Sequence, residues 1–346
     1  MTSQPVRVGI VGLGGICRSR HIPGLRAIQG VEIVAVANRT PDSGARAAAE
    51  FGIPRVCDSW EELVTLDDID AVLIGTWPYM HCPVSIAALD RGKHVFCQAR
   101  LAMDHAEAVR MRDKARATGL VAMVCPVPIG MAVDATVDRL LREPGGLGTV
   151  RLVRVQSFSN AYADPEAFMN WRKDHRLSGL NMHTFGMFVE VMHRWFGWTR
   201  FVSASTQTYT PGRVDADGET VQVRIPDQFL VDMEMEAGFH VQCVFNTAVH
   251  HGEDTVEVFG SDGTLRYVVA EDALLIARAG ERAFGPVEPL PDERYDLAHW
   301  RVEQDFINAI RTGSPARPDF EDGRRYMEVV DAAWQSAADS RRLLLG

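Results

Sequence analysis

The sequence predicts an α/β protein in which a doubly wound parallel sheet is followed by an α+β domain with a large open, mostly antiparallel sheet. Three observations support this expectation. Up to about residue 125, short apolar runs alternate with amphipathic helical patterns, as in successive βαβ units. After about residue 150, long strand patterns follow one another with turn residues between them. A glycine-rich turn directly follows the first apolar run.

Residues 1–125 are expected to form the first domain. Two of its helices are predicted to begin at capping boxes, because Ser59 stands three residues before Glu62 and Asp104 stands three residues before Glu107. Between the helical patterns lie short apolar runs without alternation, as expected for strands that are covered on both faces. These strands are predicted at Val6–Val11, Val31–Ala37, 71–75, His94–Cys97 and 121–124.

Residues 126–346 are expected to form the second domain. It begins where two prolines interrupt both kinds of pattern, near residues 125–130. Stretches such as "FLVDMEMEA" and "HVQCVFNTAV" then predict successive strands. Helical patterns remain at about 182–195, 300–311 and 323–341.

Composition narrows the class of partner. The formal net charge of −10 argues against nucleic acid or an anionic membrane surface as the main partner, but it does not exclude an anionic ligand. The first residues show no signal peptide, and no apolar run is long enough to span a membrane. The six cysteines are scattered without a CxxC pair, which is typical of buried, reduced thiols. We therefore expect a cytoplasmic protein.

The turn in "VGIVGLGGIC" resembles the G-x-G-x-x-G fingerprint of dinucleotide-binding domains, with Cys17 in place of the last glycine. Gly12 would allow the tight turn, and Gly14 would let the backbone approach a pyrophosphate. The N–H groups that follow, at Gly15 and Ile16, begin a helix and would meet the phosphates. The alternative is a plain tight turn.

The second predicted strand ends in "VAVANRT", where NAD-binding domains usually carry an acidic residue for the ribose 2′-hydroxyl. Here that residue is Asn38, followed by Arg39. A neutral side chain removes repulsion toward a 2′-phosphate, and a guanidinium can bind that phosphate with two hydrogen bonds. The pattern therefore favours NADP over NAD as the cofactor. The alternative is a turn capped by Asn38 with Arg39 in solvent.

Longer stretches make a family resemblance specific. They include "IDAVLIGTWPYMHCPVSIAALDRGKHVFC", "VEVFGSDGTL" and "DFINAIRTGSPARPDFEDGRRYMEVVDAAWQSA". In these, the chain resembles the Gfo/Idh/MocA family, named for glucose–fructose oxidoreductase and inositol dehydrogenase. The resemblance implies a dinucleotide-binding Rossmann domain, and a second domain that binds substrate and forms a homodimer or homotetramer. It also implies a nicotinamide cofactor and, commonly, a sugar or polyol substrate.

The resemblance also assigns residues to the site. It implies a nicotinamide near the end of the His94–Cys97 strand, and Trp171 and Arg172 match a "WR.D" segment on the substrate side. The aromatic rings of Trp77, Tyr79, Tyr162 and Trp171 could stack on a sugar. The alternative is that each of these rings packs in the core. The resemblance suggests further cofactor contacts at Thr76, His81, Gln98 and Arg100.

Two departures from the family pattern concern catalysis. Gln98, Ala99 and Arg100 stand where the family has Glu-Lys-Pro, so the lysine that assists proton transfer is replaced by Ala99. The second departure is in "SGLNMHTFGMFVEVMHRWFG", where neither alignment restores the family's Asp and His pair. We expect His183 to be the acid or base, with Lys173 as a weaker candidate, since a histidine titrates near neutrality. The alternative is that His183 is a packed or solvated helix residue. Substrate contacts are expected from Asn181 and Thr184.

The sequence therefore predicts an NAD(P)-dependent oxidoreductase that acts on a sugar, a polyol or a related hydroxyl or carbonyl compound. The alternative is a family member that binds a dinucleotide without net redox chemistry, as a non-redox enzyme or a regulatory binding protein. The replaced lysine favours this alternative. No HExxH motif or Cys/His cluster is present, and neighbouring histidines such as His250 and His251 would point to opposite faces of a strand. We therefore expect no metal site.

Overall fold

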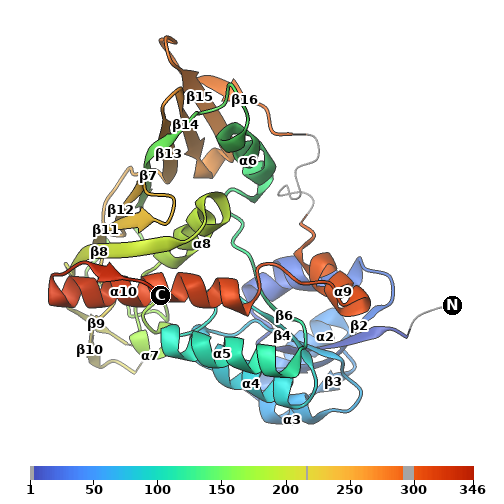
Figure 1. Cartoon of the computed structure of the whole chain (residues 1–346). Coiled ribbons are helices and arrows are strands. Elements are labelled where there is room, and N and C mark those ends of the chain that lie inside the picture. Colours follow the sequence, from blue (N-terminus) through green and yellow to red (C-terminus); the bar gives the residue numbers. More distant parts are fainter. Residues whose placement is uncertain (1–3, 216, 291–299) are drawn as a thin grey trace. The chain divides into compact units, whose positions relative to one another are not determined.

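The computed structural model describes residues 4–215, 217–290 and 300–346 (Figure 1). The chain divides into two compact units, Met1–Pro126 with His299–Met327, and Val127–Ala298 with Glu328–Gly346. Helix α9 (Val302–Thr312) follows the second unit along the chain but belongs to the first, where it packs against α1 (Ile22–Arg26). Burial of its apolar stripe, which includes Val302, Phe306 and Ile307, explains this position.

Among the described residues, the N-terminal unit contains a six-stranded sheet in the order β3-β2-β1-β4-β5-β6, and every pairing is parallel. The strand order reverses between β1 and β4, and ligands of such sheets bind at the carboxyl ends of the strands beside this point. The expected doubly wound sheet is confirmed. In chain order the strands are β1 (Val6–Val11), β2 (Val31–Ala37), β3 (Arg55–Val56), β4 (Ala71–Ile74), β5 (His94–Cys97) and β6 (Ala122–Val124).

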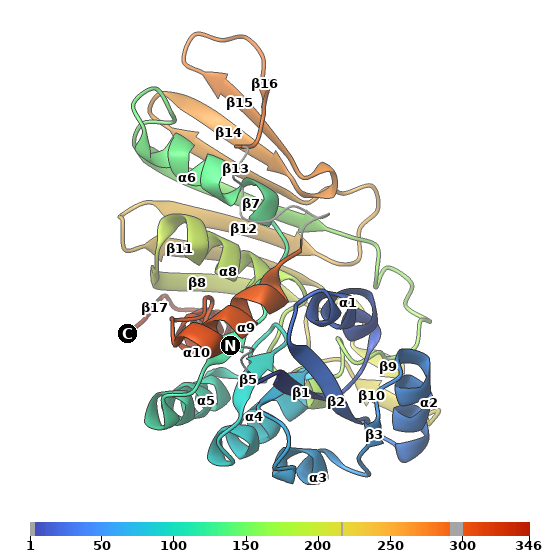
Figure 2. The ribbon, with the colours of Figure 1, turned by 90° about the vertical axis from the view of Figure 1, so that its right-hand side faces the viewer.

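Helices cover both faces of this sheet. Figure 2 shows α3, α4 and α5 on one face and α1 with α9 on the other. The two predicted caps are confirmed, since Ser59 Oγ accepts from the Glu62 N–H at 3.1 Å and Asp104 Oδ1 accepts from the Glu107 N–H at 2.8 Å. A π-helical turn, η1 (Cys17–His21), leads into α1. The remaining helices are α2 (Pro41–Phe51), α3 (Trp60–Thr65), η2 (Pro78–Met80), α4 (His81–Asp90) and α5 (His105–Thr118).

The second unit contains a nine-stranded sheet in its described part, in the order β16-β15-β14-β13-β7-β12-β11-β8-β17. The β7–β12 pair is parallel and the other pairs are antiparallel, so the mostly antiparallel sheet is confirmed. The strands are β7 (Val150–Phe158), β8 (Thr199–Gln207), β11 (Gln228–Met235), β12 (His240–Asn246), β13 (Thr255–Gly260), β14 (Gly263–Val268), β15 (Ala273–Arg278), β16 (Gly285–Val287) and β17 (Leu343–Leu344).

The two faces of this large sheet differ. Helices α6 (Asp134–Arg142) and α8 (Phe185–Phe196) lie on one face (Figure 2). The strands of this sheet bury side chains such as Val153. The other face carries charged side chains: the Glu257 carboxylate accepts hydrogen bonds from Arg154 Nε and from Arg266 Nη2, each at 2.8 Å. An exposed apolar residue there, Leu230, retains 42% of its accessible surface. This face is therefore open and mixed in character.

The second unit also contains smaller elements. A two-stranded sheet joins β9 (Gly212–Val214) to β10 (Thr220–Gln222), and α7 (His175–Ser178) is a single turn. Helix α10 (Phe320–Asp339) contributes residues to both units. All six cysteines are buried, and none of them forms a disulfide bond with another described residue. None of the helices in the described part of the chain is long and apolar enough to cross a membrane.

One ionic cluster links α5 to the start of α10. The Glu321 carboxylate accepts hydrogen bonds from Arg112 at 2.9 Å, Arg324 at 2.9 Å and Arg116 at 3.2 Å. Burial acts to raise the pKa of this carboxyl, but the hydrogen bonds from Arg324 and Arg112 outweigh it and lower the pKa to about 2.

This cluster gives a pH-dependent contribution to stability. Since the folded pKa lies below the unfolded value, the contribution is present above about pH 4.5 and is lost as the pH falls toward 2. We expect Glu321→Gln to lower the free energy of unfolding at pH 7 by about 1–2 kcal/mol, after allowing for solvent screening. Urea unfolding at pH 7, 5 and 3 measures this, and the difference from wild type should shrink at pH 3. The exposed Glu50→Gln change is the control. A difference independent of pH would contradict the assignment.

Candidate functional site

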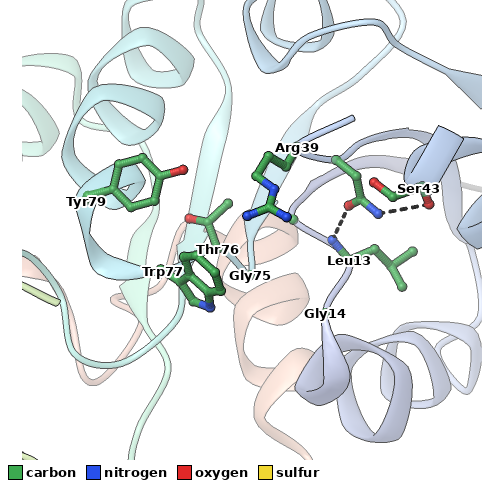
Figure 3. A pocket seen from close by; sticks show the side chains of 10 residues that line it. Leu13, Gly14, Arg39, Ser43, Gly75, Thr76, Trp77 and Tyr79 are labelled. Atoms are coloured by element: carbon green, nitrogen blue, oxygen red, sulfur yellow. Dashed lines mark hydrogen bonds between the residues drawn. The ribbon is translucent and has the colours of Figure 1, made fainter. Parts of the chain in front are cut away.

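A cavity of about 270 Å³ lies at the carboxyl ends of β1, β2 and β4 (Figure 3). It occupies the place where the strand order reverses, as expected for a nucleotide site in this kind of sheet. Most of the residues that line it were predicted from the sequence; Leu13, Ser43 and Gly75 were not. The full lining is Gly12, Leu13, Gly14, Asn38, Arg39, Ser43, Gly75, Thr76, Trp77 and Tyr79.

The glycine turn is required by a close approach of two backbone segments. Gly12 has a φ of +82°, and a Cβ there would lie 2.5 Å from the Thr76 side chain and 2.8 Å from its backbone nitrogen. A Cβ on Gly75 would lie 2.2 Å from Cys17 Sγ. The small residue that the fingerprint usually has at position 17 is thus replaced by a cysteine that packs against Gly75. The sequence signal for this contact is Gly75, a glycine that directly follows the strand paired with β1.

The two glycines that follow the turn leave the backbone open. Gly14 and Gly15 are exposed, as is Ile16, and a Cβ on Gly15 would meet nothing within 4 Å. Helical backbone begins here, so its first N–H groups face solvent beside the cavity. Burial raises the pKa of the Cys17 thiol to about 12, so this cysteine is a packing residue and not a nucleophile. The residues present therefore suit the pyrophosphate of a dinucleotide.

Asn38 ties the glycine turn to helix α2. Its Oδ1 accepts from the Leu13 N–H at 2.7 Å, and its Nδ2 donates to the Ser43 carbonyl at 3.2 Å. Thr40 caps the same helix by accepting from the Ser43 N–H at 3.3 Å. The amide of Asn38 keeps one N–H and one lone pair beyond these two bonds, so the capping role and a ribose contact are compatible.

Arg39 extends into the cavity. Its guanidinium lies 5.9 Å from the centroid of the Trp77 ring, and Figure 3 shows both side chains at the cavity. Among the described residues, no carboxylate pairs with Arg39. A cationic group without an anionic partner beside a nucleotide cavity is suited to a phosphate.

His81 and Arg100 hold the backbone near the end of β5. The His81 ring is fully buried, with Nδ1 2.9 Å from the Arg100 carbonyl and Nε2 3.0 Å from the Thr76 carbonyl. Burial lowers the pKa of His81. Arg100 is itself 6% exposed, whereas Gln98 is partly exposed. His81 thus connects the end of β5 to the segment that lines the nucleotide cavity.

In the second unit, Lys173 is fully buried and anchored on three sides. Its ammonium group donates to the Ile225 carbonyl at 3.1 Å, to the Pro226 carbonyl at 3.2 Å and to the Asp227 carboxylate. Burial lowers the pKa of Lys173 to about 8, while Asp227 acts in the opposite direction. Since each ammonium proton has an acceptor, this geometry describes a structural ion pair.

His183 and Lys173 both lie beside the ring of Tyr162. The ring centroid of His183 is 4.9 Å from that of Tyr162, and the Lys173 ammonium group lies 4.7 Å from the same Tyr162 ring. His183 also stacks on Phe229 at 6.2 Å. The sequence pattern predicted a helix from residue 182, but α8 begins at Phe185 because His183 has a left-handed backbone with φ +49°. Tyr162, considered from the sequence only as a stacking residue, therefore joins the two predicted catalytic residues.

The expected substrate residues are dispersed around this cluster. Asn181 is buried and donates to the Ser178 carbonyl at 2.6 Å. Thr184 Oγ1 lies 3.1 Å from Ser157 Oγ. Arg172 is exposed, with its guanidinium 4.3 Å from the centroid of the Trp171 ring. No group of three or more His, Cys, Asp or Glu side chains that could hold a metal ion occurs in the described ranges.

Comparisons with known proteins agree with this architecture. The family described as "Oxidoreductase family, NAD-binding Rossmann fold" matches residues 6–125, and its "C-terminal alpha/beta domain" matches residues 143–345. The chain is 26% identical to levoglucosan dehydrogenase of Pseudarthrobacter phenanthrenivorans, over 97% of each chain. It is 25% identical to inositol 2-dehydrogenase of Gluconacetobacter diazotrophicus, over 96% of this chain and 94% of that protein.

A solved structure has the same fold. It is levoglucosan dehydrogenase in complex with NADH and L-sorbose, with a TM-score of 0.87 at 23% identity, over 99% of this chain and all of that chain. Both family domains are present in order, the first has the parallel sheet and glycine turn of a nucleotide-binding domain, and the matches span nearly the whole chain. The chain belongs to the Gfo/Idh/MocA family of oxidoreductases.

Proposed function

We propose that this protein is an NADP-preferring oxidoreductase that transfers a hydride between the nicotinamide and a sugar, a polyol or a related hydroxyl or carbonyl compound. The observation that carries the cofactor preference is Arg39, a guanidinium at the nucleotide cavity that pairs with no carboxylate of the described residues. The substrate class is supported by the relatives, whose names include levoglucosan and inositol dehydrogenases. The glycine turn and the first N–H groups after it would hold the pyrophosphate.

The chemistry requires a proton acceptor or donor in addition to the cofactor. The nicotinamide supplies or accepts the hydride when it is bound. The substrate hydroxyl must also exchange a proton, and Ala99 has no group that can do so. We assign this role to His183. Lys173 is the weaker candidate for proton transfer, because its ammonium protons are already directed at three oxygen atoms.

The proposal extends to the organisation of the protein. Residues 1–125 would bind the dinucleotide, and residues 126–346 would bind substrate and form the oligomer interface. The protein would act in the cytoplasm. A second function, dinucleotide binding without net redox chemistry, is favoured by one observation, the alanine at position 99. Firm binding of NADPH, with no turnover on a broad panel of sugars and polyols, would support that second function.

Cofactor preference is tested at Arg39. We expect NADPH to bind more tightly than NADH, and Arg39→Ala to narrow the gap by about 1–3 kcal/mol, because a charge-assisted contact to the 2′-phosphate is lost. Arg39→Lys should fall between the two, since an ammonium group keeps the charge without the paired donors. Titration calorimetry measures all affinities. Arg46→Ala, an exposed change on α2, is the matched control. Equal affinity of the wild type for NADPH and NADH would refute the preference.

The assignment of His183 as acid or base is tested by mutation. A substrate is first identified by following the absorbance of the reduced nicotinamide with a panel of sugars and polyols. Asparagine tolerates the left-handed backbone at this position better than alanine does, so His183→Asn is the cleaner variant. We expect His183→Asn and His183→Ala to reduce turnover by roughly 10²–10⁴-fold, with cofactor affinity nearly unchanged. His250→Ala, an exposed histidine, serves as the control. Normal turnover by the Asn variant would exclude His183 from proton transfer.

Assembly is tested by light scattering. The open face of the large sheet presents Leu230 among charged pairs, and such a face is suited to pairing with a second copy. We expect a particle mass of two or four times the 38.3 kDa of one chain at micromolar concentration. Leu230→Lys should shift the mass toward that of one chain, while Val214→Lys on the small sheet should not. A wild-type protein that stays a monomer contradicts this part of the proposal.

A further inference from the structure

A buried hydrogen-bonded chain of three side chains lies within the N-terminal unit at the carboxyl end of β5. Its members are Glu303 of α9, His21 at the end of the π-helical turn η1, and Gln98 directly after β5. Glu303 Oε1 contacts His21 Nδ1, and His21 Nε2 contacts Gln98 Nε2. His21 is 0% exposed and Glu303 is 1% exposed. The three residues are up to 282 positions apart in the sequence, so tertiary structure alone brings them together.

The chemistry of the three groups fixes the positions of the protons. An amide nitrogen can donate a hydrogen bond but cannot accept one, so His21 Nε2 must accept from Gln98. An imidazole that accepts at Nε2 carries its proton on Nδ1, from which the proton is donated to the Glu303 carboxylate. The orientation of the Gln98 amide follows from these two bonds. With its nitrogen directed at His21, its Oε1 is on the other branch of the carboxamide and remains an acceptor.

Neighbouring residues pack against Glu303 and His21 and leave room for their side chains. A Cβ on Gly24 would lie 2.3 Å from Glu303 Oε2, so only glycine leaves room for the carboxylate. The Trp300 indole Nε1 donates to Glu303 Oε1 at 3.0 Å. The His21 ring meets Phe96 edge-on, with 5.2 Å between the ring centroids. Glu303 Oε2 has no hydrogen-bond partner among the described residues, although it is buried.

Such an arrangement is unfavourable for stability by itself. A buried carboxylate with one oxygen unbonded carries a desolvation penalty that a well-packed apolar residue would avoid. The hydrogen-bonded series of side chains ends at Gln98, which is partly exposed. Gln98 lies at the carboxyl edge of the parallel sheet, and dinucleotides bind at this edge of such sheets. The carboxamide of a nicotinamide offers N–H donors, and the Gln98 oxygen is an acceptor of matching chemistry.

We infer that Glu303 and His21 are positioning residues that orient the Gln98 carboxamide, so that its oxygen accepts a hydrogen bond from the carboxamide N–H of the nicotinamide. This inference rests on the proposed function, in which a nicotinamide dinucleotide is the cofactor. It adds a specific partner, Gln98, for the nicotinamide end of the cofactor. The residues proposed for the adenosine end, Asn38 and Arg39, lie elsewhere in the sequence.

Binding measurements test the inference without any substrate. The probes are NADPH, 2′-phospho-ADP-ribose, which lacks the nicotinamide, and the 3-acetylpyridine analogue of NADPH, which lacks the carboxamide N–H. We expect Gln98→Met to weaken NADPH binding by about 2- to 10-fold, the effect of losing one hydrogen bond, and to leave 2′-phospho-ADP-ribose binding unchanged. The wild type should prefer NADPH to the analogue, and Gln98→Met should lose that preference.

The positioning residues are tested in the same way. His21→Phe fills the aromatic environment but provides no acceptor for Gln98, so it should reproduce the loss seen with Gln98→Met. Glu303→Gln keeps an acceptor for the His21 Nδ1 proton and should bind NADPH nearly as the wild type does. His94→Phe is the matched control, because His94 lies at the opposite end of β5, where its Nδ1 accepts from the Val121 N–H at 3.0 Å.

Each outcome decides the matter. Loss of affinity for NADPH and for 2′-phospho-ADP-ribose to the same extent would overturn the inference, since the nicotinamide would then not be involved. An unchanged preference for NADPH over the analogue in Gln98→Met would also overturn it. Nitrogen-15 NMR of the histidines in the cofactor-free protein gives an independent readout, and a proton on Nε2 of His21 in place of Nδ1 would be contrary evidence. If the wild type binds none of the three probes, the proposed function itself is wrong.

Discussion

A close approach of two backbone segments, at the ends of β1 and β4, sets the floor of the nucleotide cavity. Gly12 leaves no space for a Cβ against Thr76, and Gly75 leaves none against the Cys17 thiol. The strands pair directly, so neither segment can withdraw without loss of sheet hydrogen bonds. The glycine turn, the π-helical turn that begins with Cys17 and the cavity wall at Thr76 all depend on this contact. It also explains how a fingerprint without its third glycine remains compatible with a close-packed helix.

Much of the first unit follows from local sequence. The strands Val6–Val11, Val31–Ala37 and His94–Cys97 were predicted with the bounds that the structure has, because strands covered on both faces are continuous apolar runs between turn residues. The capping boxes at Ser59 and Asp104 are also local, since a cap and its partner are three residues apart. The chain of Glu303, His21 and Gln98 could not be predicted in this way, because no pattern in the sequence relates residues so far apart.

In the second unit, too, local sequence patterns do not predict how polar residues are buried. A stretch such as "WRKDHR" has the composition of a solvated loop, yet Lys173 is fully buried because three oxygen atoms from residues 225–227 surround its ammonium group. The start of α8 was placed too early, because the apolar periodicity continues through His183 while its backbone turns left-handed. Both differences arise from tertiary contacts, which outweigh local preference where the ring of Tyr162 joins Lys173 to His183.

The two-sided hydrogen bonding of Asn38 has a consequence for engineering a change of cofactor. Designs that exchange NADP for NAD commonly aim at the residue that ends the second strand, since an acidic group there binds the ribose hydroxyls. In this chain the amide at that position also joins the glycine turn to α2, and a carboxylate could accept from Leu13 but could not donate to the Ser43 carbonyl. A designer would therefore weaken the scaffold by changing residue 38 first. Arg39 makes no such structural bond in the described part of the chain, so under the proposed function it is the position at which cofactor choice would be altered independently of the turn.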